Sequence, residues 1–158
     1  MTIALYAGSF DPITYGHLDI IRSGVEIFDK LIIAVANNSN KKTFIKTDDR
    51  LRLINECVKN FSNVEVCSFD GLTVDFAKQN NVSVLLRGIR DVKDFEYEKE
   101  LAFVNSKLNN EIKTVFLFSN PEHCFISSSN VREIYANNGN LKDFVPENVI
   151  SYLKNEIL

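Results

Sequence analysis

Short apolar runs alternate with longer segments of helical spacing along this chain. Runs such as "LIIAVA" and "VFLF" contain no polar residue, as expected of strands that are covered by helices on both faces. This alternation predicts an α/β fold built on a parallel sheet. We therefore expect a single doubly wound domain over residues 1–158, with a five-stranded parallel sheet. The expected strands are residues 3–7, 31–36, 64–69, 82–86 and 114–118.

About six helices are expected between and after these strands, and five of them can be located from apolar residues that repeat every three or four positions. The apolar faces of the first three contain Leu18, Ile21, Val25 and Phe28; Leu51, Ile54 and Val58; and Tyr97, Leu101, Val104 and Leu108. The third of these helices covers 91–108, and two more are expected near 130–137 and from Pro146 onward. Thr47 is expected to cap the second helix. The run "VEVCSF" alternates polar and apolar residues, which is typical of an edge strand.

Composition excludes several classes of protein. The formal net charge of −3 argues against a protein that coats nucleic acid. No apolar run approaches the roughly 20 residues of a membrane span, and the N-terminus lacks the pattern of a secretory signal. Cys57, Cys67 and Cys124 lack C-x-x-C spacing, so neither a disulfide framework nor a zinc site is indicated. We expect a cytoplasmic protein with reduced cysteines that binds neither nucleic acid nor membranes.

Polar segments follow three of the expected strands: "GSFDP" with "YGH", then "RGIR", then "SNPEHCFISSSN". Ligands of open parallel sheets bind outside the carboxyl ends of the strands, where the strand order reverses. These segments would therefore line one cleft if the first and fourth strands are neighbours. They offer a histidine at a helix N-terminus, two arginines and three serines, all of which suit phosphate. Neither G-x-G-x-x-G nor G-x-x-x-x-G-K-[ST] occurs, which disfavours dinucleotide dehydrogenases and P-loop enzymes.

The segment "GSFDPITYGH" resembles the G-[ST]-F-D-P-x-[TH]-x-G-H motif of the nucleotidyltransferase superfamily. "RGIRDVKDFEYE" and "FISSSNVRE" resemble the later motifs of the bacterial phosphopantetheine adenylyltransferases. This resemblance covers essentially the whole chain. It implies a Rossmann-like nucleotidyltransferase fold and transfer of AMP from ATP to 4′-phosphopantetheine, giving dephospho-coenzyme A and pyrophosphate. It also implies Mg²⁺ as cofactor, a homohexamer, and dephospho-coenzyme A or coenzyme A as product or inhibitor ligands.

The resemblance also implies roles for residues at matching positions. His17 would bind ATP and stabilise the transition state, and Mg²⁺ would be held mainly by the nucleotide phosphates rather than by protein ligands. Because the acceptor's phosphate is itself an anionic nucleophile, no protein nucleophile is needed. The ATP-binding residues would be Ser9, Phe10, His17, Gly88, Ile89, Arg90, Glu98, His123, Cys124, Phe125, Ile126, Ser127, Ser128 and Ser129. The acceptor-binding residues would be Ser9, Lys41 (or its neighbour Lys42), Thr73 and Arg87.

Plain structural roles remain open for some of these residues: a helix cap for His17 or the serines, and an exposed surface acid for Glu98. Two alternatives concern the whole protein. One is a sister nucleotidyltransferase that acts on glycerol phosphate or nicotinamide mononucleotide, against which the arginine and serine motifs argue. The other is a non-catalytic module that binds a nucleotide or senses coenzyme A, which would not need to retain His17, Lys41 and Arg87 together.

Overall fold

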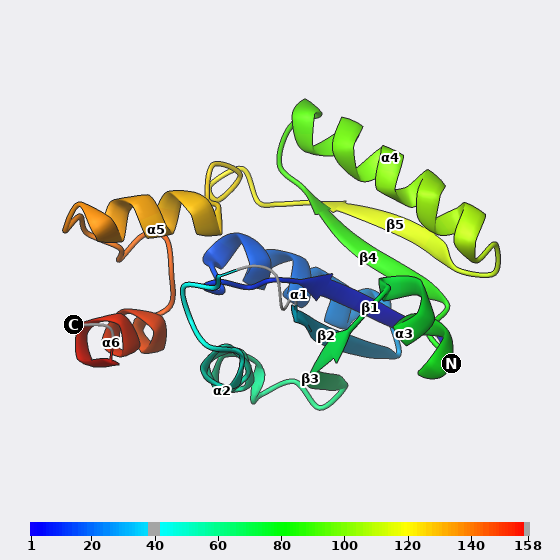
Figure 1. Ribbon diagram of the computed structural model, residues 1–158, viewed down its shortest axis with the longest axis horizontal. Coiled ribbons are helices and arrows are strands. Elements are labelled where there is room, and N and C mark those ends of the chain that lie inside the picture. Colours follow the sequence, from blue (N-terminus) through cyan, green and yellow to red (C-terminus); the bar gives the residue numbers. More distant parts are fainter. Residues whose placement is uncertain (38–41, 157–158) are drawn as a thin grey trace.

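The computed structural model of the chain describes residues 1–37 and 42–156 (Figure 1). Strands and helices alternate through most of this part of the chain, as the sequence predicts. In order they are β1 (Ile3–Gly8), α1 (Tyr15–Ile27), β2 (Lys30–Asn37), α2 (Thr47–Val58), β3 (Val64–Asp70), α3 (Thr73–Gln79), β4 (Val84–Ile89), α4 (Val92–Leu108), β5 (Lys113–Phe118), α5 (Ser128–Ala136) and α6 (Glu147–Glu156).

The five strands form one parallel sheet in the order β3-β2-β1-β4-β5. β1 therefore pairs with β2 on one side and with β4 on the other, and the strand order reverses between β1 and β4. This confirms the predicted doubly wound sheet and the predicted neighbourhood of the first and fourth strands. It also confirms that "VEVCSF" lies at an edge, as β3.

Helices pack on both faces of the sheet. Because successive residues of a strand point to opposite faces, the strands contribute side chains to two separate cores. In β1, Ala4 and Tyr6 face a core shared with α1, α2, α5 and α6. Leu5 and Ala7 face the other core, where Val74 of α3 packs. α4 lies along β4 and β5, while α5 and α6 extend past the sheet at one end of the molecule (Figure 1).

Two local predictions are corrected by the structure, and one helix is found that the sequence did not locate. β4 continues through Arg87, Gly88 and Ile89, which the sequence places after the strand, because these residues pair with Phe116 to Phe118 of β5. Thr47 is the first residue of α2 rather than its cap, and its hydroxyl donates to the Asn37 side chain at 2.8 Å. The seven-residue helix α3 is the sixth helix, which the sequence did not locate.

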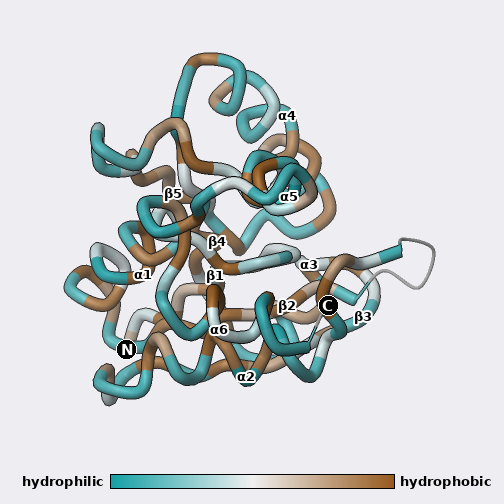
Figure 2. The backbone as a smooth tube through the Cα atoms, turned by 90° about the vertical axis from the view of Figure 1, so that its left-hand side faces the viewer, coloured by the Kyte–Doolittle hydropathy of each residue, from teal (hydrophilic) through white to brown (hydrophobic). Residues whose placement is uncertain are grey.

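The outer side of α4 and β5 is exposed, contrary to prediction. β5 is an edge strand that is only half-buried, so the expectation that "VFLF" is covered on both faces is wrong. The predicted apolar face of α4 is likewise not core, because Tyr97, Val104 and Leu108 are exposed. Figure 2 shows apolar residues along the central strands and also on α4, at the periphery. Within residues 1–37 and 42–156, no helix combines the length and apolarity needed to cross a membrane.

Candidate active site

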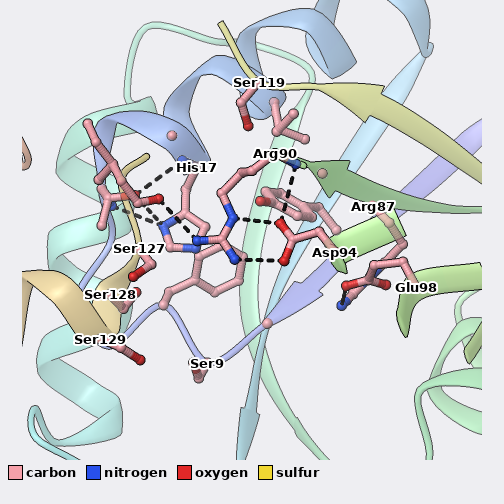
Figure 3. Close-up of a pocket in the computed structure, with 18 of the residues that line it drawn as sticks. Ser9, His17, Arg87, Arg90, Asp94, Glu98, Ser119, Ser127, Ser128 and Ser129 are labelled. Atoms are coloured by element: carbon pink, nitrogen blue, oxygen red, sulfur yellow. Dashed lines mark hydrogen bonds and ion pairs between the residues drawn. The ribbon is translucent and has the colours of Figure 1, made fainter. Parts of the chain in front are cut away.

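A cleft of about 330 Å³ opens at the carboxyl ends of β1 and β4, where the sheet order reverses (Figure 3). All three polar segments singled out in the sequence contribute to its lining. In Figure 3 the serines at the start of α5 and His17 lie on one side of the cleft, and two ion pairs lie on the other. The cleft brings together eleven of the predicted site residues: Ser9, Phe10, His17, Arg87, Gly88, Arg90, Glu98, Ile126, Ser127, Ser128 and Ser129.

The other predicted site residues lie elsewhere. Ile89 is buried in β4, and His123, Cys124 and Phe125 are in the loop between β5 and α5 without lining the cleft. Thr73 lines a second cavity of about 110 Å³. Lys41 falls outside the described residues. The functional roles of all these residues remain predictions.

His17 is held by the first turn of α1. Thr14 caps this helix: its hydroxyl accepts the His17 backbone N–H at 3.4 Å, while its own N–H donates to His17 Nδ1 at 3.1 Å. The reciprocal bonds form a capping box, so the histidine cap that the sequence leaves open is present. Because Nδ1 accepts a backbone N–H, the neutral imidazole carries its proton on Nε2. Among the described residues Nε2–H has no bonding partner, so it is available as a donor in the cleft.

The charge state of His17 follows from its surroundings. Burial, and then the positive charges of Arg90 and Arg87, lower the pKa of His17 to about 4. Its ring also packs on Phe10, with the ring centroids 5.0 Å apart. At neutral pH the side chain is thus an uncharged hydrogen-bond donor of fixed direction, which suits stabilisation of a phosphate oxygen better than acid–base exchange.

A buried arginine of α2 stabilises the turn that follows β1. Phe10 adopts a left-handed backbone conformation with φ of 46°, which is rare for a bulky residue. Arg50 is only 1% exposed, and it donates to the Ser9 carbonyl at 2.6 Å and to the Thr47 hydroxyl at 2.9 Å. Asp11 is also buried, and its carboxylate accepts the backbone N–H groups of Phe44 and Ile45 at 2.8 Å each. These bonds keep the strained turn in one conformation.

Two of the arginines that line the cleft, Arg87 and Arg90, are engaged by carboxylates of α4. Arg87 donates to the two oxygens of Glu98 at 2.7 and 2.6 Å, and to the Ala7 carbonyl at 2.7 Å. Arg90 donates to the two oxygens of Asp94 at 2.6 and 2.9 Å. Glu98 is buried at 8% exposure, so the alternative of an exposed surface acid is wrong.

The serines at the start of α5 are less free than their spacing suggests. Ser127 is the N-cap of α5 and accepts the Asn130 N–H at 3.1 Å, which confirms the cap alternative for one of the three serines. The Ser128 hydroxyl donates to the Pro12 carbonyl at 2.8 Å. Ser129 accepts from Arg132 at 3.1 Å. The wall of the cleft formed by the start of α5 therefore offers an anion the backbone N–H groups of the helix end and the guanidinium of Arg132.

Sequence reasoning missed Arg132 and Asp94, which both line the cleft. Arg132 donates to the Asp11 carbonyl at 2.7 Å and ties α5 to the turn after β1. A signal was present: Arg132 lies four residues after Ser128, on the same helix face. Asp94 likewise lies four residues before Glu98.

The donor set of the cleft bears on metal binding. No group of three or more His, Cys, Asp or Glu side chains that could hold a metal ion occurs in the described part of the chain. The cleft carboxylates Asp94 and Glu98 are both occupied by arginines. This chemistry fits Mg²⁺ that arrives on the phosphates of a nucleotide, as Mg²⁺ commonly does.

Comparisons with known proteins identify the family. Phosphopantetheine adenylyltransferase from Clostridium perfringens (strain 13 / Type A) is 44% identical over 158 residues, covering 100% of this chain and 96% of the relative. The protein of that name from Caldanaerobacter subterraneus subsp. tengcongensis is 48% identical over 153 residues, covering 97% of this chain and 96% of the relative. This chain belongs to the phosphopantetheine adenylyltransferase family.

Broader matches agree with this family. The family model described as cytidylyltransferase-like matches residues 5–134. A crystal structure of a Vibrio parahaemolyticus protein assigned as a nicotinate-nucleotide adenylyltransferase superposes with a TM-score of 0.71 at 17% identity. The superposition covers 98% of this chain and 100% of the Vibrio parahaemolyticus chain. At 17% identity this similarity shows the fold alone. The predicted Rossmann-like nucleotidyltransferase fold is thus confirmed.

Proposed function

We propose that this phosphopantetheine adenylyltransferase family member transfers the adenylyl group of ATP to 4′-phosphopantetheine, giving dephospho-coenzyme A and pyrophosphate. The observation that carries the proposal is identity of 44–48% to proteins of that name over nearly their full length. The cleft supports it chemically, because neutral donors, three arginines and a helix N-terminus converge where a phosphate-rich substrate would lie.

The reaction requires little of the protein beyond positioning and charge stabilisation. An oxygen of the acceptor's phosphate attacks the α-phosphorus of ATP, the bond from that phosphorus to the bridging oxygen breaks, and pyrophosphate leaves. His17 Nε2–H would donate to a non-bridging oxygen of the α-phosphate, where negative charge grows in the transition state. The Thr14 N–H fixes the ring for this task.

The acceptor's place is suggested by the second cavity. It shares Ala7, Arg87 and Glu98 with the main cleft and continues between α3 and α4, past Thr73 and Asn105. Apolar side chains and an amide suit the pantetheine arm, which alternates methylene and amide groups. Arg87 stands where the two cavities meet, and there it would bind the phosphate of the acceptor.

Mg²⁺ belongs to the proposal as the ion that accompanies ATP, with the nucleotide phosphates as its main ligands. It would neutralise charge on the phosphates that leave. The engaged state of Asp94 and Glu98 supports this assignment over a protein-held ion.

The finer features implied by the family are also proposed for this chain: a homohexamer, a cytoplasmic location where ATP is available, and dephospho-coenzyme A or coenzyme A as cleft ligands. The exposed apolar side chains on α4 and β5 support self-association, with Phe103 and Phe118 exposed at 68% and 79%. Light scattering coupled to size exclusion measures the assembly, and a monomer at micromolar concentration would contradict it.

The function is tested by pyrophosphate release with ATP and Mg²⁺, with 4′-phosphopantetheine, glycerol 3-phosphate and nicotinamide mononucleotide offered in separate reactions. CTP replaces ATP in a parallel series. We expect release only with ATP and phosphopantetheine. Release with another acceptor would assign a sister activity, and ATP binding without release would favour a sensor.

A further inference from the structure

The loop between β5 and α5, residues 119–127, reaches the cleft at both of its ends. Ser119 at one end and Ser127 at the other line the cleft, as does Ile126 (Figure 3). The middle of the loop instead packs outside the cleft, on the first turns of α1. Contacts that fix the middle of this short loop therefore also limit how far its two ends can move.

His123 is the residue through which the middle of the loop contacts α1. Its Nδ1 lies 2.7 Å from Asp19 Oδ2, and its ring stacks on the ring of Tyr15 with the centroids 5.5 Å apart. Tyr15 and Asp19 are four residues apart, so they lie on one face of the helix. The buried Gly16 lets the loop come close, because a Cβ added there would lie 3.6 Å from the His123 carbonyl oxygen. The loop thus rests directly on the helix that carries His17.

The hydrogen bond between Asp19 and His123 has a fixed direction and is partly shielded from solvent. A carboxylate accepts hydrogen bonds, so Nδ1 of His123 carries the hydrogen and is the donor. The side chains of Asp19 and His123 are 12% and 25% exposed, and solvent and salt therefore weaken their interaction less than that of a fully exposed pair. Arg22, which is exposed and lies 3.7 Å from Asp19, adds little. His123 is therefore the main partner of Asp19.

The other hydrogen bonds that join the loop to the sheet and helices are longer. At the β5 end, the Ser119 N–H donates to the Ile89 carbonyl at 3.1 Å. Near α5, Arg90 meets the Ile126 carbonyl at 3.4 Å, which is long for an N–H···O bond. Among the described residues, the remaining hydrogen bonds of the loop are internal or reach the start of α5. The bond to Asp19 is therefore the shortest link between the loop and another element.

We propose that Asp19 is a positioning residue for ATP, and that it acts by holding the loop of residues 119–127 against α1 through His123. This deepens the proposed function and rests on it. Asp19 does not line the cleft, so it acts on the nucleotide through the loop rather than by direct contact. Because α1 also carries His17, the bond keeps the loop and the donor to the α-phosphate in one fixed relation.

The position of the loop predicts which substrate is affected. Residues of the loop line the main cleft, whereas none of them lines the second cavity, which is assigned to the pantetheine arm. A loosened loop should therefore weaken ATP binding and leave phosphopantetheine binding nearly unchanged. A purely electrostatic role of Asp19 predicts the opposite sign, because removal of a negative charge beside the cleft would strengthen the binding of anionic ATP.

The test compares D19A with E26A by calorimetric ATP binding and by steady-state assays of both substrates. Glu26 is an exposed acid about two turns further along α1, so E26A makes the same change in charge on the same helix. We expect D19A to raise Kd and KM for ATP about fivefold, with KM for phosphopantetheine changed less than twofold. E26A and R22M, which removes the exposed partner of Asp19, should resemble wild type. An unchanged or lower KM for ATP, or an equal rise in both KM values, would overturn the proposal.

A double-mutant cycle tests whether Asp19 acts through His123. H123F removes the Nδ1 donor but keeps a ring that can stack on Tyr15, and it should raise Kd for ATP at least as much as D19A does. In the H123F background, D19A should have almost no further effect. H123N, whose amide N–H is as many bonds from the backbone as histidine Nδ1, should recover part of the loss. Additive effects of D19A and H123F would reject the coupling.

Two measurements separate this inference from folding and from the proposed function. Urea unfolding shows whether D19A is folded, and D19N, which keeps a neutral oxygen acceptor, should give a smaller rise in Kd with the same selectivity for ATP. Calorimetric ATP binding needs no acceptor, so it tests the bond between Asp19 and His123 even if wild type releases no pyrophosphate with phosphopantetheine, which would reject the proposed function. Wild-type ATP binding by an active D19A would reject only this inference.

Discussion

Two walls of the cleft, formed by α1 and by α4, are built from different chemistry. On the α1 side, His17, Thr14 and Phe10 are uncharged and are fixed by backbone hydrogen bonds and ring packing. On the α4 side, Arg87 and Arg90 are charged and are fixed by carboxylates. A neutral donor of fixed direction adds little to the binding of an anion already surrounded by cations, but it gains strength where charge develops. The α1 wall should therefore govern kcat, and the α4 wall should govern KM.

The largest effect is expected from the α1 wall. H17A should lower kcat about 100-fold, because it removes one donor to the transition state, while ATP binding by calorimetry changes little. H17Q, which restores a side-chain N–H, should recover part of the loss. Equal losses in kcat and in ATP affinity would remove the distinction between the two walls.

A somewhat smaller effect is expected from the α4 wall. R87M should raise KM for phosphopantetheine about 30-fold, since charge-assisted bonds to a phosphate contribute about 2 kcal/mol. R22M is the matched control, because Arg22 is an exposed arginine of α1 that pairs with Asp19 away from the cleft lining. If R87M lowers kcat with KM unchanged, the α4 wall also acts in the transition state.

A weaker effect should follow from removing the support of His17. T14A removes the N-cap hydroxyl of α1 and should lower the free energy of unfolding by about 1 kcal/mol, measured with urea. It should also lower kcat severalfold, because the ring keeps the backbone N–H but loses the hydroxyl 3.0 Å away. T14S keeps the hydroxyl and should resemble wild type. A stability loss without any change in kcat would show that the cap does not orient the imidazole.

The smallest effect is expected from pH: between pH 8 and 6.5 the protonation state of His17 should hardly change. Its pKa of about 4 lies below the ordinary 6.5, so the folded protein binds this proton less readily than the unfolded chain does. The stability that neutral His17 contributes is complete above pH 6.5 and is lost as pH falls toward 4. Imidazole NMR should show the Nε2–H form down to about pH 5. Titration near 6.5 would contradict the neutral α1 wall.

Much of the fold is readable from the sequence because it depends on periodicity. The predictions agree with the structure for the apolar runs that form β1 and β2, which are buried in the sheet. They also agree for α1, where Leu18 and Ile21 pack into the core. Errors occur where partners outweigh local pattern. Arg87 to Ile89 look like a polar loop, yet they extend β4 because β5 runs beside them. In α4 the apolar residues repeat at helical spacing, but this spacing does not show whether the apolar face of the helix is covered by another element.

The candidate site divides in the same way. The sequence locates His17 and the arginines because they stand in short motifs at the ends of strands. It cannot supply their partners, because Glu98 lies 11 residues from Arg87 and the Ala7 carbonyl lies 80 residues away. Nor can it show that the hydroxyl of Ser128 is already bonded to Pro12, since that contact depends on how α5 docks. Motifs identify the groups, and tertiary contacts decide which of their atoms remain available.

The different exposure of the three cysteines allows one of them to be labelled selectively with a fluorophore. Cys124 is exposed in the loop between β5 and α5, whereas Cys57 and Cys67 are half-buried. Burial raises the pKa of both Cys57 and Cys67, so fewer of their thiols are reactive thiolates. A maleimide fluorophore added at neutral pH should label Cys124 first, without any substitution. Its emission would then follow the loop beside the cleft in real time, whether or not a turnover takes place.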